Sequence, residues 1–140
     1  MGVLKGSFIF LADLVRRMDI PCQVEFVRLS SYGSSAVSSG KIKVVSPLPG
    51  SIRGRDVVVV EDIVDSGLTI SFLLNYLRRK RPASVKLCAM FVKGSPGDFP
   101  FPIDYMGMEI PKEFVVGYGL DFNEEYRYLP DLRILESEAD

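Results

Sequence analysis

The stretch VVVVEDIVDSGLTI, residues 57–70, constrains the fold more than any other part of the chain. Its four valines form a short, continuous, β-branched run, which is typical of a strand buried on both faces in the middle of a parallel sheet. Glu61, Asp62 and Asp65 follow directly. Ligands of an open α/β sheet bind just beyond the carboxyl ends of its strands. We therefore expect these acids to emerge where the strand ends, at a binding site.

Other segments of the chain alternate between strand and helix patterns. Apolar residues recur at helical spacing from Phe8 to Met18 and from Ile70 to Leu77. Strand patterns cover residues 22–29, 42–46, 84–93, 103–110, 113–117 and 132–136. This order predicts an α/β fold with a mostly parallel sheet flanked by helices. The Ser/Gly-rich segment 30–41 predicts a mobile loop.

Composition narrows the class of protein. A length of 140 residues suits one domain. The 17 basic and 18 acidic residues give a net charge of -1, which argues against binding nucleic acid or a membrane by bulk charge. The basic run Arg78–Arg81 is interpreted as a solvated helix end.

There is no histidine, which excludes a Ser-His-Asp triad and a His-ligated zinc site. Two cysteines and no apolar run of ~20 residues predict a cytoplasmic protein.

The turn after the buried strand has the features of a phosphate cradle. Asp65 to Thr69 would lead into a helix, whose first N–H groups are unpaired and carry partial positive charge. Gly67 lets the backbone approach a ligand closely, and Ser66 and Thr69 add hydroxyl donors. The Walker pattern and the dinucleotide pattern G-x-G-x-x-G are absent after this strand. The phosphate would therefore be held by backbone and hydroxyl groups.

Glu61 and Asp62 would repel that phosphate, so their expected partners are sugar hydroxyls or a hard cation such as Mg²⁺. Phosphate, sugar and magnesium together indicate a phosphorylated ribose. The run from Val57 to Thr69 resembles the phosphoribosyl pyrophosphate signature of the type I phosphoribosyltransferases. The stretches GVLKGSFIFLADL, RLSSYG and FVVGYGLDFNEEYR look like the hypoxanthine-guanine phosphoribosyltransferases of that family.

The resemblance implies an architecture. Residues 1–140 would form a single phosphoribosyltransferase domain, with a Rossmann-like core and a small C-terminal hood. Residues 30–41 would be the mobile active-site loop, and residues 103–140 the base-binding hood and the last strands. Family members normally carry a few dozen more residues ahead of GVLKG. We therefore expect the chain to be N-terminally short, with an open apolar edge beside the main strand.

The resemblance also implies an activity. The protein would transfer phosphoribosyl from phosphoribosyl pyrophosphate to hypoxanthine or guanine, giving IMP or GMP plus pyrophosphate, with Mg²⁺ as cofactor. Asp65 would be catalytic and handle the proton of the purine N7. Without the resemblance, its expected role is only to cap the helix. The remaining implied sites are phosphoribosyl-binding Glu61, Asp62, Ser66, Gly67, Leu68 and Thr69; pyrophosphate-binding Lys5, Gly6 and Arg127; purine-binding Lys93, Phe114, Val115 and Asp121; loop residues Ser31 and Tyr32; and metal-binding Glu61, Asp62 and Asp121.

Several alternatives stay open at this point. Without the resemblance, Lys93 is a solvated lysine at a strand end and Phe114 is a core residue. The chain could be a non-catalytic regulatory relative that binds nucleotide or phosphoribosyl pyrophosphate, or an inactive truncated product.

The pyrophosphate loop of the family, here LKGS, often carries a non-proline cis peptide. The resemblance further implies a homodimer or homotetramer that binds neither nucleic acid nor membranes.

Overall fold

A six-stranded sheet forms the centre of the molecule. The computed structural model describes residues 1–31 and 42–135. Its strands are β1 (Gly2–Leu4), β2 (Phe26–Ser31), β3 (Ile42–Ser46), β4 (Asp56–Val64), β5 (Ser84–Lys93) and β6 (Tyr105–Ile110). They lie in the order β3-β2-β1-β4-β5-β6, and every neighbouring pair is parallel except β2 and β3. The prediction of a mostly parallel α/β sheet is confirmed.

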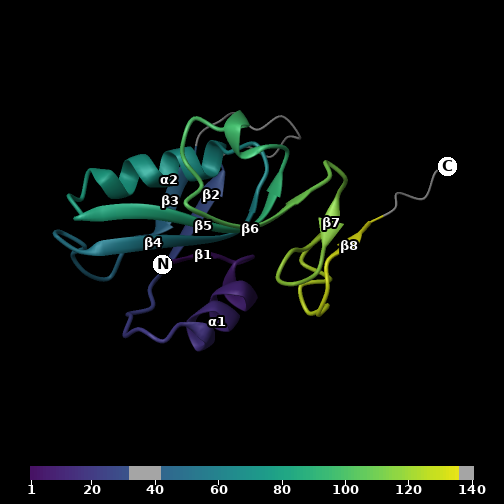
Figure 1. Ribbon diagram of the computed structural model, residues 1–140, viewed down its shortest axis with the longest axis horizontal. Coiled ribbons are helices and arrows are strands. Elements are labelled where there is room, and N and C mark those ends of the chain that lie inside the picture. The colour runs from purple at the N-terminus through teal and green to yellow at the C-terminus, as the bar shows by residue number, and fades with distance from the viewer. Residues whose placement is uncertain (32–41, 136–140) are drawn as a thin grey trace.

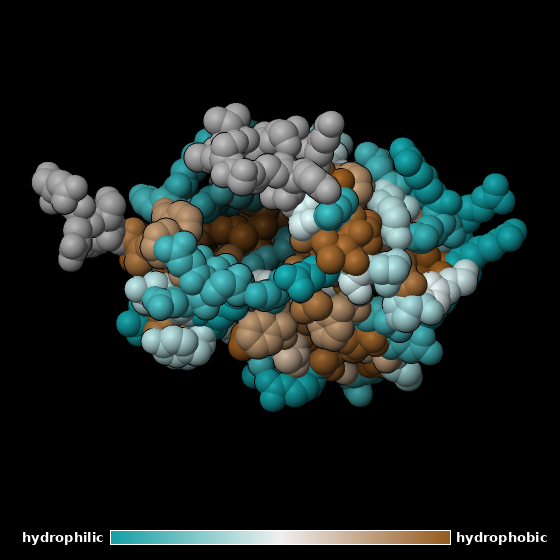
Figure 2. All heavy atoms as spheres, turned by 180° about the vertical axis from the view of Figure 1, so that it is seen from behind, coloured by the Kyte–Doolittle hydropathy of each residue, from teal (hydrophilic) through white to brown (hydrophobic). Residues whose placement is uncertain are grey.

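The two helices cover opposite faces of this sheet (Figure 1). These are α1 (Phe8–Arg17) and α2 (Leu68–Arg78), and a 3₁₀ turn, η1 (Pro96–Asp98), follows β5. β7 (Val115–Val116) and β8 (Arg133–Ile134) form a separate antiparallel pair beside the main sheet (Figure 1). Seen from behind, the surface mixes polar and apolar residues, and a recess with apolar walls opens beside this C-terminal part (Figure 2).

Alternate valines of β4 supply two separate cores. Val59 packs in the larger cluster with Leu73 and Leu77 of α2. Val60 packs in a smaller cluster with Leu11 of α1. The prediction that the whole valine run is buried on both faces is wrong for Val58, which is 37% exposed. The reason is that α1, at ten residues, is too short to cover the sheet from end to end.

β4 is longer than the sequence pattern predicted. It continues past Val60 to Val64, because parallel pairing with β5 persists from Val57 to Val64. Glu61 and Asp62 therefore lie inside the strand, and the expectation that both emerge beyond its end is wrong. Only Asp65 follows the last strand residue.

The expected open edge beside β4 is also wrong from Val58 onward. β1 lies between β2 and β4, and Gly2 is in register with Val60. The Met1 ammonium donates to the carbonyl of Val58 at 2.8 Å, and the Val60 N–H donates to the carbonyl of Met1 at 2.7 Å. The main strand thus has a hydrogen-bonded neighbour on each side.

None of the helices in the described ranges has the length and apolar character that a membrane span requires.

Packing of α2 on the sheet should dominate stability. Leu73 is fully buried in the larger core. We expect Leu73→Ala to lower the free energy of unfolding by about 2–5 kcal/mol, because it removes buried methyl groups and leaves a cavity. Asn75→Ala, on the exposed side of the same helix, is the matched control and should change it little. Denaturant titration of both variants checks this, and equal effects would contradict it.

Candidate active site

The candidate site lies where the sheet changes direction. From β1 the chain moves to β2 on one side, whereas β4, β5 and β6 extend on the other. The carboxyl ends of β1 and β4 therefore leave a crevice between them, the usual ligand position in such sheets. A cleft of about 280 Å³ opens there. Its polar lining includes Gly6, Glu61, Asp62, Asp65, Ser66, Gly67 and Thr69.

The turn from β4 into α2 leaves a helix N-terminus facing this cleft. Gly67 is the N-cap residue, with φ of 75°, and α2 begins at Leu68. The Leu68 N–H donates to the Ser66 hydroxyl at 3.4 Å. The N-cap residue Gly67 has no side chain that could cap α2, and within the described residues no N–H of this first turn donates to Asp65. The N–H groups of this turn are available to an anion.

Glycine is required at position 67 for two reasons. Its φ lies in the left-handed region, which side chains rarely adopt. A Cβ there would also lie 2.8 Å from Cδ1 of Phe99, which stacks on Phe101 with ring centroids 5.7 Å apart. The aromatic pair beneath the turn thus fixes its path.

The loop after β1 lies against the acids of β4. Lys5 and Gly6 follow Leu4, and the peptide bond between Leu4 and Lys5 is cis. A Cβ on Gly6 would overlap the Asp62 carboxylate, and a Cβ on Gly119 would overlap the Gly6 carbonyl. The loop is therefore held between β4 and the C-terminal segment, residues 117–135. Neither glycine tolerates a side chain unless the neighbouring atoms move.

The two acids inside β4 are buried. Glu61 is 6% exposed and Asp62 is 9% exposed. Burial raises the pKa of Glu61 well above its usual value, and the hydrogen bond and charge of Asp62 raise it further. No cluster of three potential metal-ligating acids, cysteines or histidines occurs in the described ranges. Two adjacent carboxylates nevertheless fit Mg²⁺, which commonly binds one or two carboxylates and takes its other ligands from phosphate and water.

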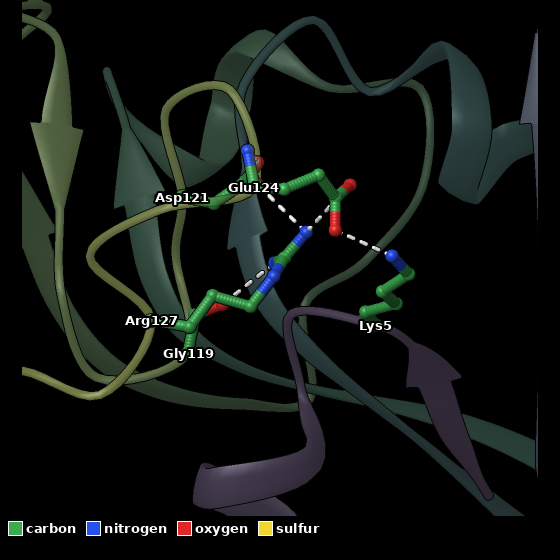
Figure 3. A network of polar contacts seen from close by, with 5 residues as sticks. All are labelled: Lys5, Gly119, Asp121, Glu124 and Arg127. Atoms are coloured by element: carbon green, nitrogen blue, oxygen red, sulfur yellow. Dashed lines mark hydrogen bonds and ion pairs between the residues drawn. The ribbon is translucent and has the colours of Figure 1, made fainter.

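The C-terminal segment places a charged network above the loop (Figure 3). Arg127 pairs with Asp121 at 2.9 Å and with Glu124 at 3.5 Å. It also donates to the Gly119 carbonyl at 2.8 Å. Lys5 pairs with Glu124 at 2.5 Å. The structure thus brings together Lys5 and Arg127, which are 122 residues apart by number, and adds Glu124, which the sequence analysis missed.

A second group of predicted residues gathers around Asp65, which lines the cleft. Lys93, the last residue of β5, pairs with Asp65 at 3.2 Å and lies 5.9 Å from the centre of the Phe114 ring. Phe114 is 50% exposed and meets Phe122 edge to face, with ring centroids 5.5 Å apart. Val115 is buried in β7. Phe114 is therefore not a core residue, and Lys93 is not a solvated one.

Tyr118 joins the C-terminal segment to α1. Its hydroxyl donates to Asp13 at 2.5 Å. Burial, followed by the hydrogen bond to Asp13, raises the pKa of Tyr118 to about 12. Nothing in the sequence spacing linked these two residues. Of the predicted loop residues, Ser31 ends β2, whereas Tyr32 and the rest of 32–41 lie outside the described residues.

Burial of Glu61 should make the folded protein less stable as pH rises. Its pKa is raised on folding, so the folded state favours the protonated acid, and stability falls as pH rises from about 4.3, the usual value for Glu. Glu61→Gln should remove this penalty. We expect its Tm to match that of the unmodified protein near pH 4 and to exceed it increasingly toward pH 7. Thermal unfolding across this range checks the sign, and a lower Tm at pH 7 would contradict it.

Comparison with known proteins identifies the family. The phosphoribosyl transferase domain family matches residues 1–123. The hypoxanthine-guanine phosphoribosyltransferase of Bacillus subtilis is 43% identical over 136 residues, covering 97% of this chain and 76% of that protein. The bifunctional protein TilS/HprT of Listeria monocytogenes is 45% identical over 138 residues, covering 99% of this chain. The chain spans only 21% of the length of that bifunctional relative.

Solved structures agree with this result. A hypoxanthine phosphoribosyltransferase from Staphylococcus aureus superposes with a TM-score of 0.89 and 36% identity, covering 96% of this chain and 73% of that one. The fold and family predictions are confirmed. The chain belongs to the phosphoribosyltransferase family and, within it, to the hypoxanthine-guanine phosphoribosyltransferases.

Proposed function

We propose that the chain transfers the phosphoribosyl group of phosphoribosyl pyrophosphate to hypoxanthine or guanine, giving IMP or GMP and pyrophosphate. The observation that carries this is the convergence of three kinds of group on one cleft. The N-terminus of α2 and the two buried acids line the cleft. Lys5, which Glu124 joins to Arg127, adjoins the lining residue Gly6, and Lys93, beside Phe114, pairs with the lining residue Asp65. These suit a phosphorylated ribose, a pyrophosphate and a flat polar base respectively.

The 5-phosphate would bind at the start of α2. Its ligands would be the N–H groups of Gly67, Leu68 and Thr69 and the hydroxyls of Ser66 and Thr69. The helix dipole and the free donors favour a dianion there. Glu61 and Asp62 would accept hydrogen bonds from the ribose hydroxyls, directly or through Mg²⁺.

The base would stack on the exposed ring of Phe114. Lys93 would donate to the purine O6, and the backbone of Val115 would meet the Watson–Crick edge. The bond from purine N9 to C1′ forms as the bond from C1′ to pyrophosphate breaks, and Asp65 takes the proton that N7 gives up. The 3.2 Å contact between Lys93 and Asp65 supports this assignment, because two groups this close could both reach one edge of a purine.

Pyrophosphate would leave past Lys5, Gly6 and Arg127. Mg²⁺, when bound, would neutralise phosphate charge and help the leaving group depart. Glu61, Asp62 and Asp121 are its proposed ligands. Asp121 already accepts hydrogen bonds from Arg127 and from the Glu124 N–H, at 2.9 Å each, so a cation there would compete with Arg127.

In this proposal residues 1–140 would be one phosphoribosyltransferase domain, with residues 103–140 as the base-binding hood and last strands. Of the proposed active-site loop 30–41, all but the first two residues lie outside the described residues. A homodimer or homotetramer in the cytoplasm stays the predicted form, with no nucleic-acid or membrane partner.

Purified protein tests the proposed function directly. With Mg²⁺ and phosphoribosyl pyrophosphate, we expect IMP from hypoxanthine or GMP from guanine, detected by chromatography. A folded protein that binds IMP but turns over neither base would instead be a non-catalytic binder.

The proposed role of Asp65 gives a sharper test. Asp65→Asn should lower turnover by ~10²-fold or more, because the amide cannot take the N7 proton, and should leave phosphoribosyl pyrophosphate binding nearly unchanged. Asp19→Asn, at an exposed position after α1, is the control and should retain full turnover. Steady-state kinetics with calorimetric binding separates the two effects. Unchanged turnover in Asp65→Asn would remove Asp65 from the mechanism.

A further inference from the structure

Glu124 occupies the position between the two cations of the proposed pyrophosphate site (Figure 3). One carboxylate oxygen lies 2.5 Å from the Lys5 ammonium, and the other lies 3.5 Å from the Arg127 guanidinium. A single carboxylate thus bridges groups from the loop after β1 and from the C-terminal segment. Any pyrophosphate that used both cations would need the space and the charge that Glu124 now holds.

The backbone places Glu124 there at some cost. Asn123 and Glu124 have φ of 51° and 68°, and Phe122 and Glu125 exchange two backbone hydrogen bonds across them. This is a two-residue hairpin turn in which both central residues need positive φ, and such turns favour Asn followed by Gly. The chain has Asn at the first position but Glu at the second. A side chain kept where glycine is favoured indicates a role for that side chain.

Neighbouring groups hold this arrangement in place. The Asp121 carboxylate accepts the Glu124 N–H at 2.9 Å, which fixes the turn. The hydrogen bond from Lys5 lowers the pKa of Glu124, so the carboxylate is charged at neutral pH. Arg127 is partly buried, and its Nε has no hydrogen-bond partner among the described residues. Glu124 itself is 64% exposed, so it can swing into solvent when an anion arrives.

We propose that Glu124 is a built-in counterion of the pyrophosphate site, and that pyrophosphate enters and leaves by exchange with its carboxylate. This inference rests on the proposed function and deepens it. The carboxylate pre-positions Lys5 and Arg127 in the empty site. It also competes with pyrophosphate, so it weakens product binding and speeds product release.

Glu124→Gln tests the exchange, because it keeps the size of the side chain and removes the charge. Calorimetry with magnesium pyrophosphate should show roughly 3- to 10-fold tighter binding than in the unmodified protein, as expected when two partly exposed ion pairs no longer compete. The difference should shrink at 1 M salt. Affinity for IMP, which lacks pyrophosphate, should not change. Glu125→Gln, at the exposed neighbouring position, should match the unmodified protein in both measurements.

Glu124→Gly is the second variant, for the case in which the glutamine variant folds poorly. Glycine suits the positive φ and also removes the carboxylate, so it should tighten pyrophosphate binding to a similar extent. Unchanged or weaker pyrophosphate binding in a folded variant would overturn the inference while leaving the proposed function intact. If the unmodified protein binds neither pyrophosphate nor IMP, the proposed function fails, and the inference fails with it.

Discussion

The close approach of three backbone segments around Gly6 is the constraint on which the rest of the site depends. Gly6 lies against the Asp62 carboxylate of β4 on one side, and its carbonyl lies against Gly119 on the other. No Cβ fits at either glycine. This contact joins β1, β4 and the C-terminal segment, which the chain visits far apart. It also sets the distance between the acids of the strand and the cations above them.

Charge balance in the cleft follows from this geometry. Lys5 pairs with Glu124, Arg127 with Asp121 and Glu124, and Lys93 with Asp65. Each cation proposed to meet the substrate is thus already paired with an acid of the protein. Glu61 differs, because burial raises its pKa and the neighbouring acid Asp62 raises it further. The protein would therefore exchange its own ion pairs for those of a ligand, whereas Glu61 and Asp62 form no ion pair within residues 1–31 and 42–135.

Much of the fold could be predicted from the sequence, because local patterns determine it. The strand patterns at 42–46 and 84–93 are strands at those same residues, and the helical spacing from Phe8 locates α1. The length of β4 could not be predicted in this way. Its last residues are acidic, and pairing with β5 rather than local preference keeps them in the strand. The exposure of Val58 likewise depends on how far α1 reaches.

The site residues that could be predicted are likewise those with a local sequence signal. The turn at residues 65–69 was identifiable because its residues are contiguous and glycine at 67 has a direct backbone reason. Glu124, Phe122 and the Tyr118–Asp13 contact were missed, because each acts through a partner distant in sequence. Only the Asn-Glu pair at 123–124 gave a local signal. Glycine is favoured at the second position of such a two-residue turn, so a glutamate there is unusual and indicates that its side chain has a role.

The crevice between β1 and β4 is the proposed binding site of phosphoribosyl pyrophosphate. Calorimetric titration of Gly6→Ala with magnesium phosphoribosyl pyrophosphate tests it most directly. The added methyl group must displace either the loop or Asp62, so binding should fall by at least tenfold relative to the unmodified protein, while thermal unfolding stays cooperative. Gly97→Ala, where a Cβ meets nothing within 4 Å, should bind normally. A folded Gly6→Ala protein with undiminished affinity would contradict the claim.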